Sequence, residues 1–257
     1  MAEHTLRFIG AFASNLCAAL KKLGAQWAQP VFAICAFMIL QAQPLFAGSP
    51  NTITIDGNND FAGDEDVPGT SGSTWYFTWD AANFYFGVEA SDVAANSATK
   101  FVLLYLDSDP RQNPFSGNGT STGQNYNTQT PGLPFNADHH FRWRTDNTFT
   151  DLMSWNGSSW VGGNNTGVAV FQSGTFVEYQ IPRANLGNPA QVYVSGAMIN
   201  EQGGVESTFF LTPQSNGPEG YDKDFAHYFG FPLVDGIAPD FSGNEDTYPV
   251  ASVTSGN

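Results

Sequence analysis

Between residues 73 and 92, apolar and polar positions alternate in two successive runs. Trp75, Phe77 and Trp79 share one side of the first run, and Phe84 and Phe86 share one side of the second. A period of two is that of a β-strand with one buried face. The polar residues 80–83 between the runs suit a tight turn. This stretch therefore predicts a β-hairpin that buries its tryptophans in the core of an all-β fold.

Similar short runs recur along the chain, separated by pairs such as Asn-Gly and Ser-Gly that favour turns. The predicted strands are 52–55, 74–79, 84–91, 100–106, 139–145, 149–155, 168–172, 176–181, 191–199, 206–211 and 225–233. Many short strands at this spacing are typical of a two-sheet antiparallel β-sandwich, here of jelly-roll-like type. A single helical turn is expected at 183–187, directly after Pro182.

Two segments modify this simple pattern. The strand 100–106 is apolar at consecutive positions after its lysine, which predicts a central strand buried on both faces. The long loop 108–138 is polar but carries Phe115, Tyr126, Leu133 and Phe135. Loops of this length are usually functional or disordered. Because this one holds aromatic residues that can pack, we expect an ordered excursion over one sheet.

The first 47 residues differ from the rest. They contain basic residues, then an apolar run at 31–40, then Ala47 followed by Gly-Ser-Pro, which is the order of a secretory signal peptide. A membrane anchor is the alternative, but a spanning helix needs about 20 apolar residues. We expect cleavage near Ala47, a β-sandwich domain at 48–236 and a weakly ordered tail at 237–257.

The charge of the chain limits the classes of partner that the protein can bind. Both cysteines lie in residues 1–47, so the expected mature protein has no disulfide. It keeps six basic and 23 acidic residues, a net charge of −17. Such a surface repels nucleic acid and anionic lipid, whereas it suits calcium. We therefore expect a secreted protein, extracellular or periplasmic, that binds no nucleic acid and, after cleavage, no membrane.

Four segments in sequence order carry a family resemblance. They are Ile53-Thr-Ile-Asp-Gly57 with Asp60-Phe61, Trp79-Asp80 with Asn83-Phe-Tyr-Phe-Gly-Val88, Phe176-Val-Glu-Tyr-Gln-Ile-Pro182, and Met198-Ile-Asn-Glu201. Together they resemble the family 9 carbohydrate-binding module and related β-sandwiches of bacterial extracellular proteins. The resemblance implies a two-sheet antiparallel sandwich, structural calcium in some members and sugar binding between aromatic side chains. Fold alone does not establish function.

A pair of tryptophans is the strongest candidate for a glycan-binding site. Trp155 and Trp160 flank a four-residue turn that begins with Asn156. An indole can stack on the apolar face of a sugar while an amide bonds its hydroxyls. The alternative is a cross-strand pair that only stabilises a hairpin. Arg142 and Arg144 share a strand face nearby and are added as candidate ligand contacts, with paired surface charges as their alternative.

Two groups of oxygen-bearing residues are candidate calcium ligands. Asp56, Asn58 and Asp60 stand at alternate positions in a glycine-containing loop, and Asp107 and Asp109 follow a predicted central strand. Calcium takes six to eight oxygen ligands, which a tight turn can bring together. The alternative is that the aspartates of the first loop cap turns. Calcium is thus expected as a structural ion.

Catalysis has little support. The expected mature chain lacks cysteine and a Gly-x-Ser-x-Gly motif, and glycosidases need a carboxylate pair at a set separation that a sequence does not show. We therefore expect a secreted, non-catalytic protein that binds a polysaccharide or other glycan. One alternative is a structural or adhesive surface protein that uses the same sandwich for protein–protein contacts. Another is a glycoside hydrolase with an unrecognised carboxylate pair.

Overall fold

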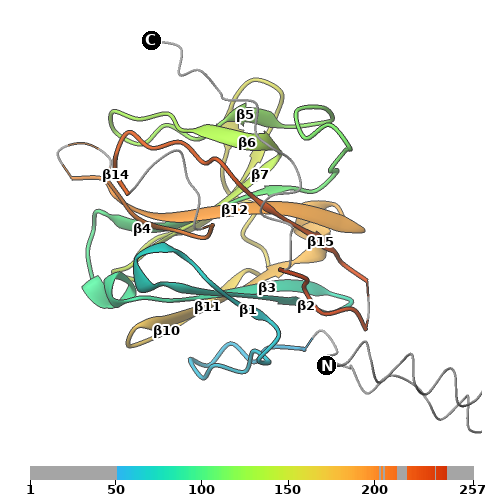
Figure 1. The fold of residues 1–257 in the computed structure, drawn as a ribbon, viewed down its shortest axis with the longest axis horizontal. Coiled ribbons are helices and arrows are strands. Elements are labelled where there is room, and N and C mark those ends of the chain that lie inside the picture. The colour runs from blue at the N-terminus through green and yellow to red at the C-terminus, as the bar shows by residue number, and fades with distance from the viewer. Residues whose placement is uncertain (1–50, 203, 205, 213–218, 235, 242–257) are drawn as a thin grey trace, which may run out of the picture. The chain divides into compact units, whose positions relative to one another are not determined.

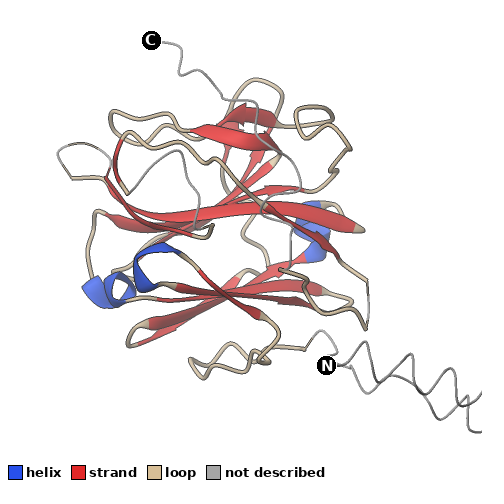
Figure 2. Cartoon of the chain, in the orientation of Figure 1, coloured by secondary structure: helices blue, strands red, loops and turns tan. Residues whose placement is uncertain are grey.

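A computed structural model describes residues 51–202, 204, 206–212, 219–234 and 236–241. The predicted signal peptide and residues 242–257 of the predicted tail lie outside this range. Strands dominate the described part, and its helical segments are three short 3-10 turns (Figure 2). They are η2 (Thr70–Gly72), η3 (Ser91–Ala95) and η4 (Arg183–Leu186). The last confirms the helical turn expected after Pro182.

The first sheet has five antiparallel strands in the order β1-β2-β3-β11-β10. Their bounds are β1 (Asp66–Pro68), β2 (Thr74–Trp79), β3 (Asn83–Glu89), β10 (Ala169–Ser173) and β11 (Phe176–Pro182). The expected hairpin is β2–β3, with Phe77 paired to Phe86. Strand β10 ends this sheet, so one of its edges pairs with no other strand among the described residues.

The second sheet has eight antiparallel strands in the order β14-β13-β12-β4-β7-β8-β9, with β15 also paired to β12. Their bounds are β4 (Lys100–Asp107), β7 (His139–Arg144), β8 (Thr150–Trp155), β9 (Trp160–Val161), β12 (Gln191–Asn200), β13 (Glu206–Phe210), β14 (Gly220–Tyr221) and β15 (Phe229–Pro232). The expected strand 225–233 is thus shorter in the structure. A small third sheet joins β5 (Thr120–Thr122) to β6 (Gly132–Ala137).

The main core lies between the two large sheets, which face each other as layers in Figure 1. Trp75, Phe77 and Trp79 are fully buried there, as the alternation predicted. The ring of Phe86 meets that of Phe141 in the opposite sheet edge-on, with centroids 5.3 Å apart. Burial of these large rings supplies most of the hydrophobic stabilisation. The prediction of an all-β, two-sheet antiparallel fold is confirmed.

The outer face of the second sheet is covered by the long loop. Leu133 and Phe135 from β6 are fully buried in a second core with Tyr105 of β4, and Tyr126 lies in a third core with Leu103. The neighbours of β4 in the sheet are β12 and β7. Both expectations are confirmed: β4 is central and buried on both faces, and the loop is an ordered cover.

The outer face of the first sheet is covered by the segment 51–65, drawn in blue next to that sheet in Figure 1. The expected strand at 52–55 is wrong, because this segment forms no ladder with a neighbouring strand. Side chains hold it instead, chiefly the buried carboxylates of Glu65 and Glu178. Gly57 adopts φ 89° and touches the ring of Phe171 so closely that a Cβ would lie 2.8 Å from it.

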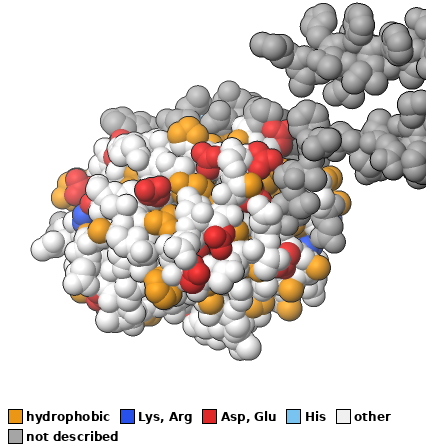
Figure 3. Space-filling model, turned by 90° about the horizontal axis from the view of Figure 1, so that it is seen from below, with side chains coloured by type: hydrophobic (Ala, Val, Ile, Leu, Met, Phe, Trp, Pro, Cys, Tyr) orange, Lys and Arg blue, Asp and Glu red, His pale blue; other side chains and the backbone are white. Residues whose placement is uncertain are grey.

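Three further features complete the description of the fold. Within the predicted tail, the ring of Phe241 packs on Phe229 and Phe231 of the main core. The face in Figure 3 shows several Asp and Glu side chains and few Lys or Arg, in keeping with the acidic composition. The described residues include no helix that is long and apolar enough to cross a membrane.

Candidate functional site

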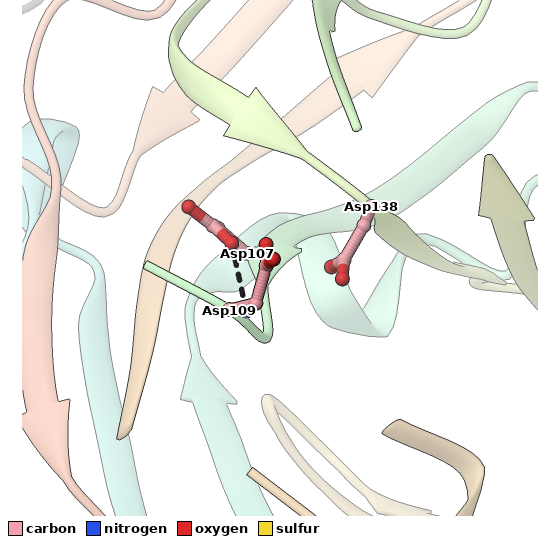
Figure 4. Close-up of side chains that lie close together, drawn as sticks. All are labelled: Asp107, Asp109 and Asp138. Atoms are coloured by element: carbon pink, nitrogen blue, oxygen red, sulfur yellow. Dashed lines mark hydrogen bonds between the residues drawn. The ribbon is translucent and has the colours of Figure 1, made fainter. Parts of the chain in front are cut away.

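Three aspartates converge where β4 ends. Asp107 is the last residue of β4, Asp109 follows two residues later, and Asp138 lies between β6 and β7. One carboxylate oxygen from each lies within 4.8 Å of the others (Figure 4). Within the described part of the chain, no other three acidic, histidine or cysteine side chains meet so closely. The structure thus brings together the predicted pair Asp107 and Asp109 and adds a third carboxylate.

The register of the sheet explains why Asp138 belongs to this group. Leu106 of β4 pairs with His139 of the antiparallel strand β7. The next residue of β4, Asp107, must then lie beside the residue before His139, which is Asp138. Sequence reasoning did not join Asp138 to Asp107 and Asp109, because 30 residues separate it from Ser108, whose backbone N–H it binds. Its place directly before a predicted strand was the available signal.

Hydrogen bonds fix the loop that carries the cluster. Asp107 Oδ1 accepts the backbone N–H of Asp109 at 2.9 Å. Asp138 accepts the backbone N–H of Ser108 at 2.9 Å and its hydroxyl at 2.5 Å. Asp109 accepts from Arg111 at 3.1 Å and from the side-chain amide of Asn118 at 3.0 Å. The carboxylates are therefore held in place by their neighbours.

The electrostatics of Asp107 are unusual. Its side chain is fully buried, and its Oδ2 has no hydrogen-bond partner in the described structure. Burial raises the pKa of Asp107 to about 8, and the negative charges of Asp138 and Asp109 add to the rise. Three carboxylates this close repel one another unless a proton or a cation intervenes. A hard divalent cation fits this donor set, because calcium prefers carboxylate and carbonyl oxygens and water.

The contacts in the other predicted calcium loop, which carries Asp56, Asn58 and Asp60, differ from those of the three aspartates. Asp56 Oδ1 accepts both the backbone N–H and the side-chain amide of Asn58 at 2.9 Å, which is a turn-capping contact. Asp60 is exposed, and the described residues give this loop no compact group of three acids. These contacts favour the turn-capping alternative for Asp56. The calcium assignment of Asp56, Asn58 and Asp60 stays a prediction.

Glu178 is a buried acid that sequence reasoning passed over. Its Oε1 accepts the backbone N–H groups of Asp56 and Gly57, both at 2.5 Å, and its Oε2 has no described partner. Burial raises the pKa of Glu178, with Asp56 and Asp60 adding to the rise. It occupies an outward position of β11, which suits a polar residue at the surface. Only the cover formed by residues 51–65 makes it a buried group.

The two candidate tryptophans form a cross-strand pair. Trp155 of β8 pairs with Trp160 of β9, and their rings meet edge-on with centroids 5.6 Å apart. Trp160 also packs edge-on against Tyr105 and His140 and donates its indole N–H to Thr122 O at 3.1 Å. Trp160 therefore braces the hairpin against the long loop. Both tryptophans are half-buried.

The polar candidates near this hairpin have partners of their own. Asn156 Oδ1 accepts the backbone N–H groups of Ser158 and Ser159, so it shapes the turn. Arg142 forms an ion pair with Asp151 at 3.0 Å and lies over the ring of Phe149. Arg144 forms an ion pair with Asp146 at 2.9 Å. These contacts favour paired charges over ligand contacts for both arginines.

Comparisons with known proteins find no matching family model, no matching curated protein and no matching solved structure. The resemblance to the family 9 carbohydrate-binding module therefore stays a prediction from the sequence motifs.

Proposed function

We propose that this chain is a secreted, non-catalytic carbohydrate-binding protein with a structural calcium ion. The observation that carries this proposal is the half-buried indole of Trp155 on a hairpin that Trp160 braces against the long loop. An indole held rigidly at a surface offers its face to the apolar side of a sugar without losing conformational freedom on binding. Exposed Asn156, Ser158 and Ser159 beside it supply amide and hydroxyl groups.

Binding is favoured over hydrolysis by the burial of the acids at this cluster. Glycosidases place a sugar between two carboxyl groups, about 5–5.5 Å apart in retaining enzymes and about 6.5–9.5 Å apart in inverting ones. Asp107 is fully buried, and Asp109 and Asp138 are half-buried. A sugar has no access to Asp107, whereas a small cation fits among the three carboxylates.

Calcium enters the proposal as a stabilising ion at the three aspartates. It would neutralise three carboxylates at a place where burial, with the negative charges of Asp138 and Asp109, raises the pKa of Asp107. Asp107, Asp109 and Asp138 would hold it, and backbone carbonyls or water would complete the usual six to eight oxygens. Because the cluster ties the end of β4 to the start of β7, the ion would anchor the long loop.

Three finer points belong to the same proposal. Residues 1–47 act as a cleaved signal peptide, the sandwich is jelly-roll-like, and the chain is a distant relative of the family 9 module.

The competing role is a structural or adhesive protein with protein partners. A glycan array probed with the purified protein distinguishes the two roles. Selective binding to polysaccharides supports the proposal, and absence of binding to every glycan overturns it.

A further inference from the structure

A groove opens at the lateral edge of the sandwich, away from the tryptophan hairpin and the three aspartates. It lies between the edge strand β10 and the hairpin of β7 and β8, and its volume is about 470 Å³. Clefts that hold small ligands commonly have about 300–1,000 Å³. The residues that line it are neutral amides, one hydroxyl, two valines and two aromatics, with no Lys, Arg, Asp or Glu among them.

The amides of this groove are held in place before any ligand arrives. Asn147 accepts the indole N–H of Trp143 at 3.1 Å and donates to Gln172 Oε1 at 2.8 Å. Gln172 in turn donates to the backbone oxygens of Val93 and Gly174. Asn165 Oδ1 accepts the backbone N–H of Leu152 at 2.7 Å. An amide oxygen accepts two hydrogen bonds and an amide nitrogen donates two. The nitrogen of Gln172 already donates two, but the amide oxygens of Asn147, Asn165 and Gln172 each accept one of these bonds and keep capacity for a ligand hydroxyl.

Apolar surface lies next to these amides. Val168 and Val170 are half-buried, pack against the main core and line the same groove. The hydroxyl of Thr150 comes from β8 on the opposite side. Carbohydrates complement this combination of groups, because each sugar ring has apolar C–H faces and a rim of hydroxyls that both donate and accept hydrogen bonds.

We propose that this lateral groove binds neutral sugar residues of a polysaccharide. The charge of the groove distinguishes among carbohydrates. A lining without cations offers no partner to uronate or sulfate groups, and the net charge of −17 of the expected mature protein repels them. An extended peptide added to the free edge of β10 is the competing occupant. The converging amides and hydroxyl favour a sugar, because strand addition depends on backbone groups rather than on such side chains. The inference rests on the proposed function and gives it a second binding surface.

The test is a nuclear magnetic resonance titration of the ¹⁵N-labelled protein with neutral hexasaccharides: β-1,4-linked glucose, xylose and N-acetylglucosamine, and α-1,4-linked glucose. The indole N–H of Trp143 and the side-chain amides of Asn147 and Gln172 should shift as ligand is added. A hexamer of galacturonate should leave them unchanged. Shifts confined to Trp155 and Trp160 would contradict sugar binding in the groove but would leave the proposed function standing. Absence of binding by all neutral sugars would overturn both.

Variants make the test quantitative. Thr150→Val keeps the shape of the side chain but removes its hydroxyl, and Gln172→Ala removes an amide of the groove. Each should weaken binding about three- to tenfold, the effect of losing one hydrogen bond to a neutral group. Gln180→Ala is the matched control, because Gln180 faces away from the groove and also donates to a backbone oxygen, that of Gly167. Unchanged affinity of folded Thr150→Val and Gln172→Ala would overturn the inference, as would binding of extended peptides alone.

Discussion

The side chain of Asn147, in the turn between β7 and β8, donates a 2.8 Å hydrogen bond to Gln172 of the edge strand β10. This bond joins the two sheets at the open side of the sandwich. Asn147 also accepts the indole N–H of the buried Trp143, and its backbone is left-handed with φ 59°. Asn147 thus stabilises the turn, the core and the contact between the two sheets.

Replacing Asn147 should therefore be costly for stability. Asn147→Ala leaves the Trp143 indole N–H without its partner, which costs about 1–3 kcal/mol, and replaces an asparagine, which tolerates the left-handed region, with an alanine, which is strained there. Asn147→Gly loses the same bonds without the backbone strain, so it should be about 1 kcal/mol more stable than the alanine variant. Urea denaturation of both variants measures the difference. Equal stability would contradict the role of backbone strain.

Calcium should raise the melting temperature. At 100 times its dissociation constant, an ion that binds only the native state adds about 2.7 kcal/mol, or about 5–10 °C for a domain of this size. Asp109→Asn should abolish the shift, whereas Asp60→Asn in the other candidate loop should preserve it. Differential scanning calorimetry with calcium and with chelator provides the measurement. The opposite pattern would move the ion to the loop of Asp56, Asn58 and Asp60.

The two tryptophans of the hairpin should differ in effect. Trp160→Ala removes contacts with Tyr105 and His140 and the bond to Thr122, so it should cost about 2–3 kcal/mol, somewhat less than loss of a fully buried tryptophan. Trp155→Ala should cost about 1 kcal/mol but weaken glycan binding. Chemical denaturation alongside glycan titration separates stability from affinity. Normal binding by folded Trp155→Ala would remove Trp155 as a contact.

The buried carboxyl of Glu65 should make stability depend on pH. Burial raises the pKa of Glu65, despite hydrogen bonds from Thr78, Ala62 and Asn51. A native pKa above the unfolded value of about 4.3 means that the native state holds the proton more tightly. The stability contribution is complete below pH 4.3 and is lost as pH rises through the native pKa. Glu65→Gln does not titrate, so unfolding free energies measured across this range should fall less steeply than those of the wild type. Parallel curves would argue against the effect.

Export should remove residues 1–47. The basic start, the apolar run at 31–40 and Ala47 predict a new N-terminus at Gly48. Mass spectrometry of protein collected from the culture medium or periplasm should find it. Recovery of the chain from the membrane with Met1 intact would support the anchor alternative instead.

The pattern of apolar residues was enough to predict the longer strands of the two large sheets and the main core, but not the strands β1, β5, β6, β9 and β14. Trp75, Phe77 and Trp79 are buried as expected, because a period of two fixes which side chains share a face. The continuous apolar run of β4 likewise predicted burial on both faces. Local turn chemistry predicted η4. These features depend on neighbours in sequence, so the sequence by itself determined them.

Contacts between distant segments were decided by the tertiary structure. Asp138 joins Asp107 and Asp109 only because β4 and β7 pair in one register, and a shift of one residue would separate them. Glu178 is buried only because residues 51–65 cross the sheet, and those residues lack the ladder partner that their alternation predicted. The lateral groove exists because β10 ends one sheet beside the β7–β8 hairpin of the other. Strand order and register depend on the packing of the whole chain, which no local pattern contains.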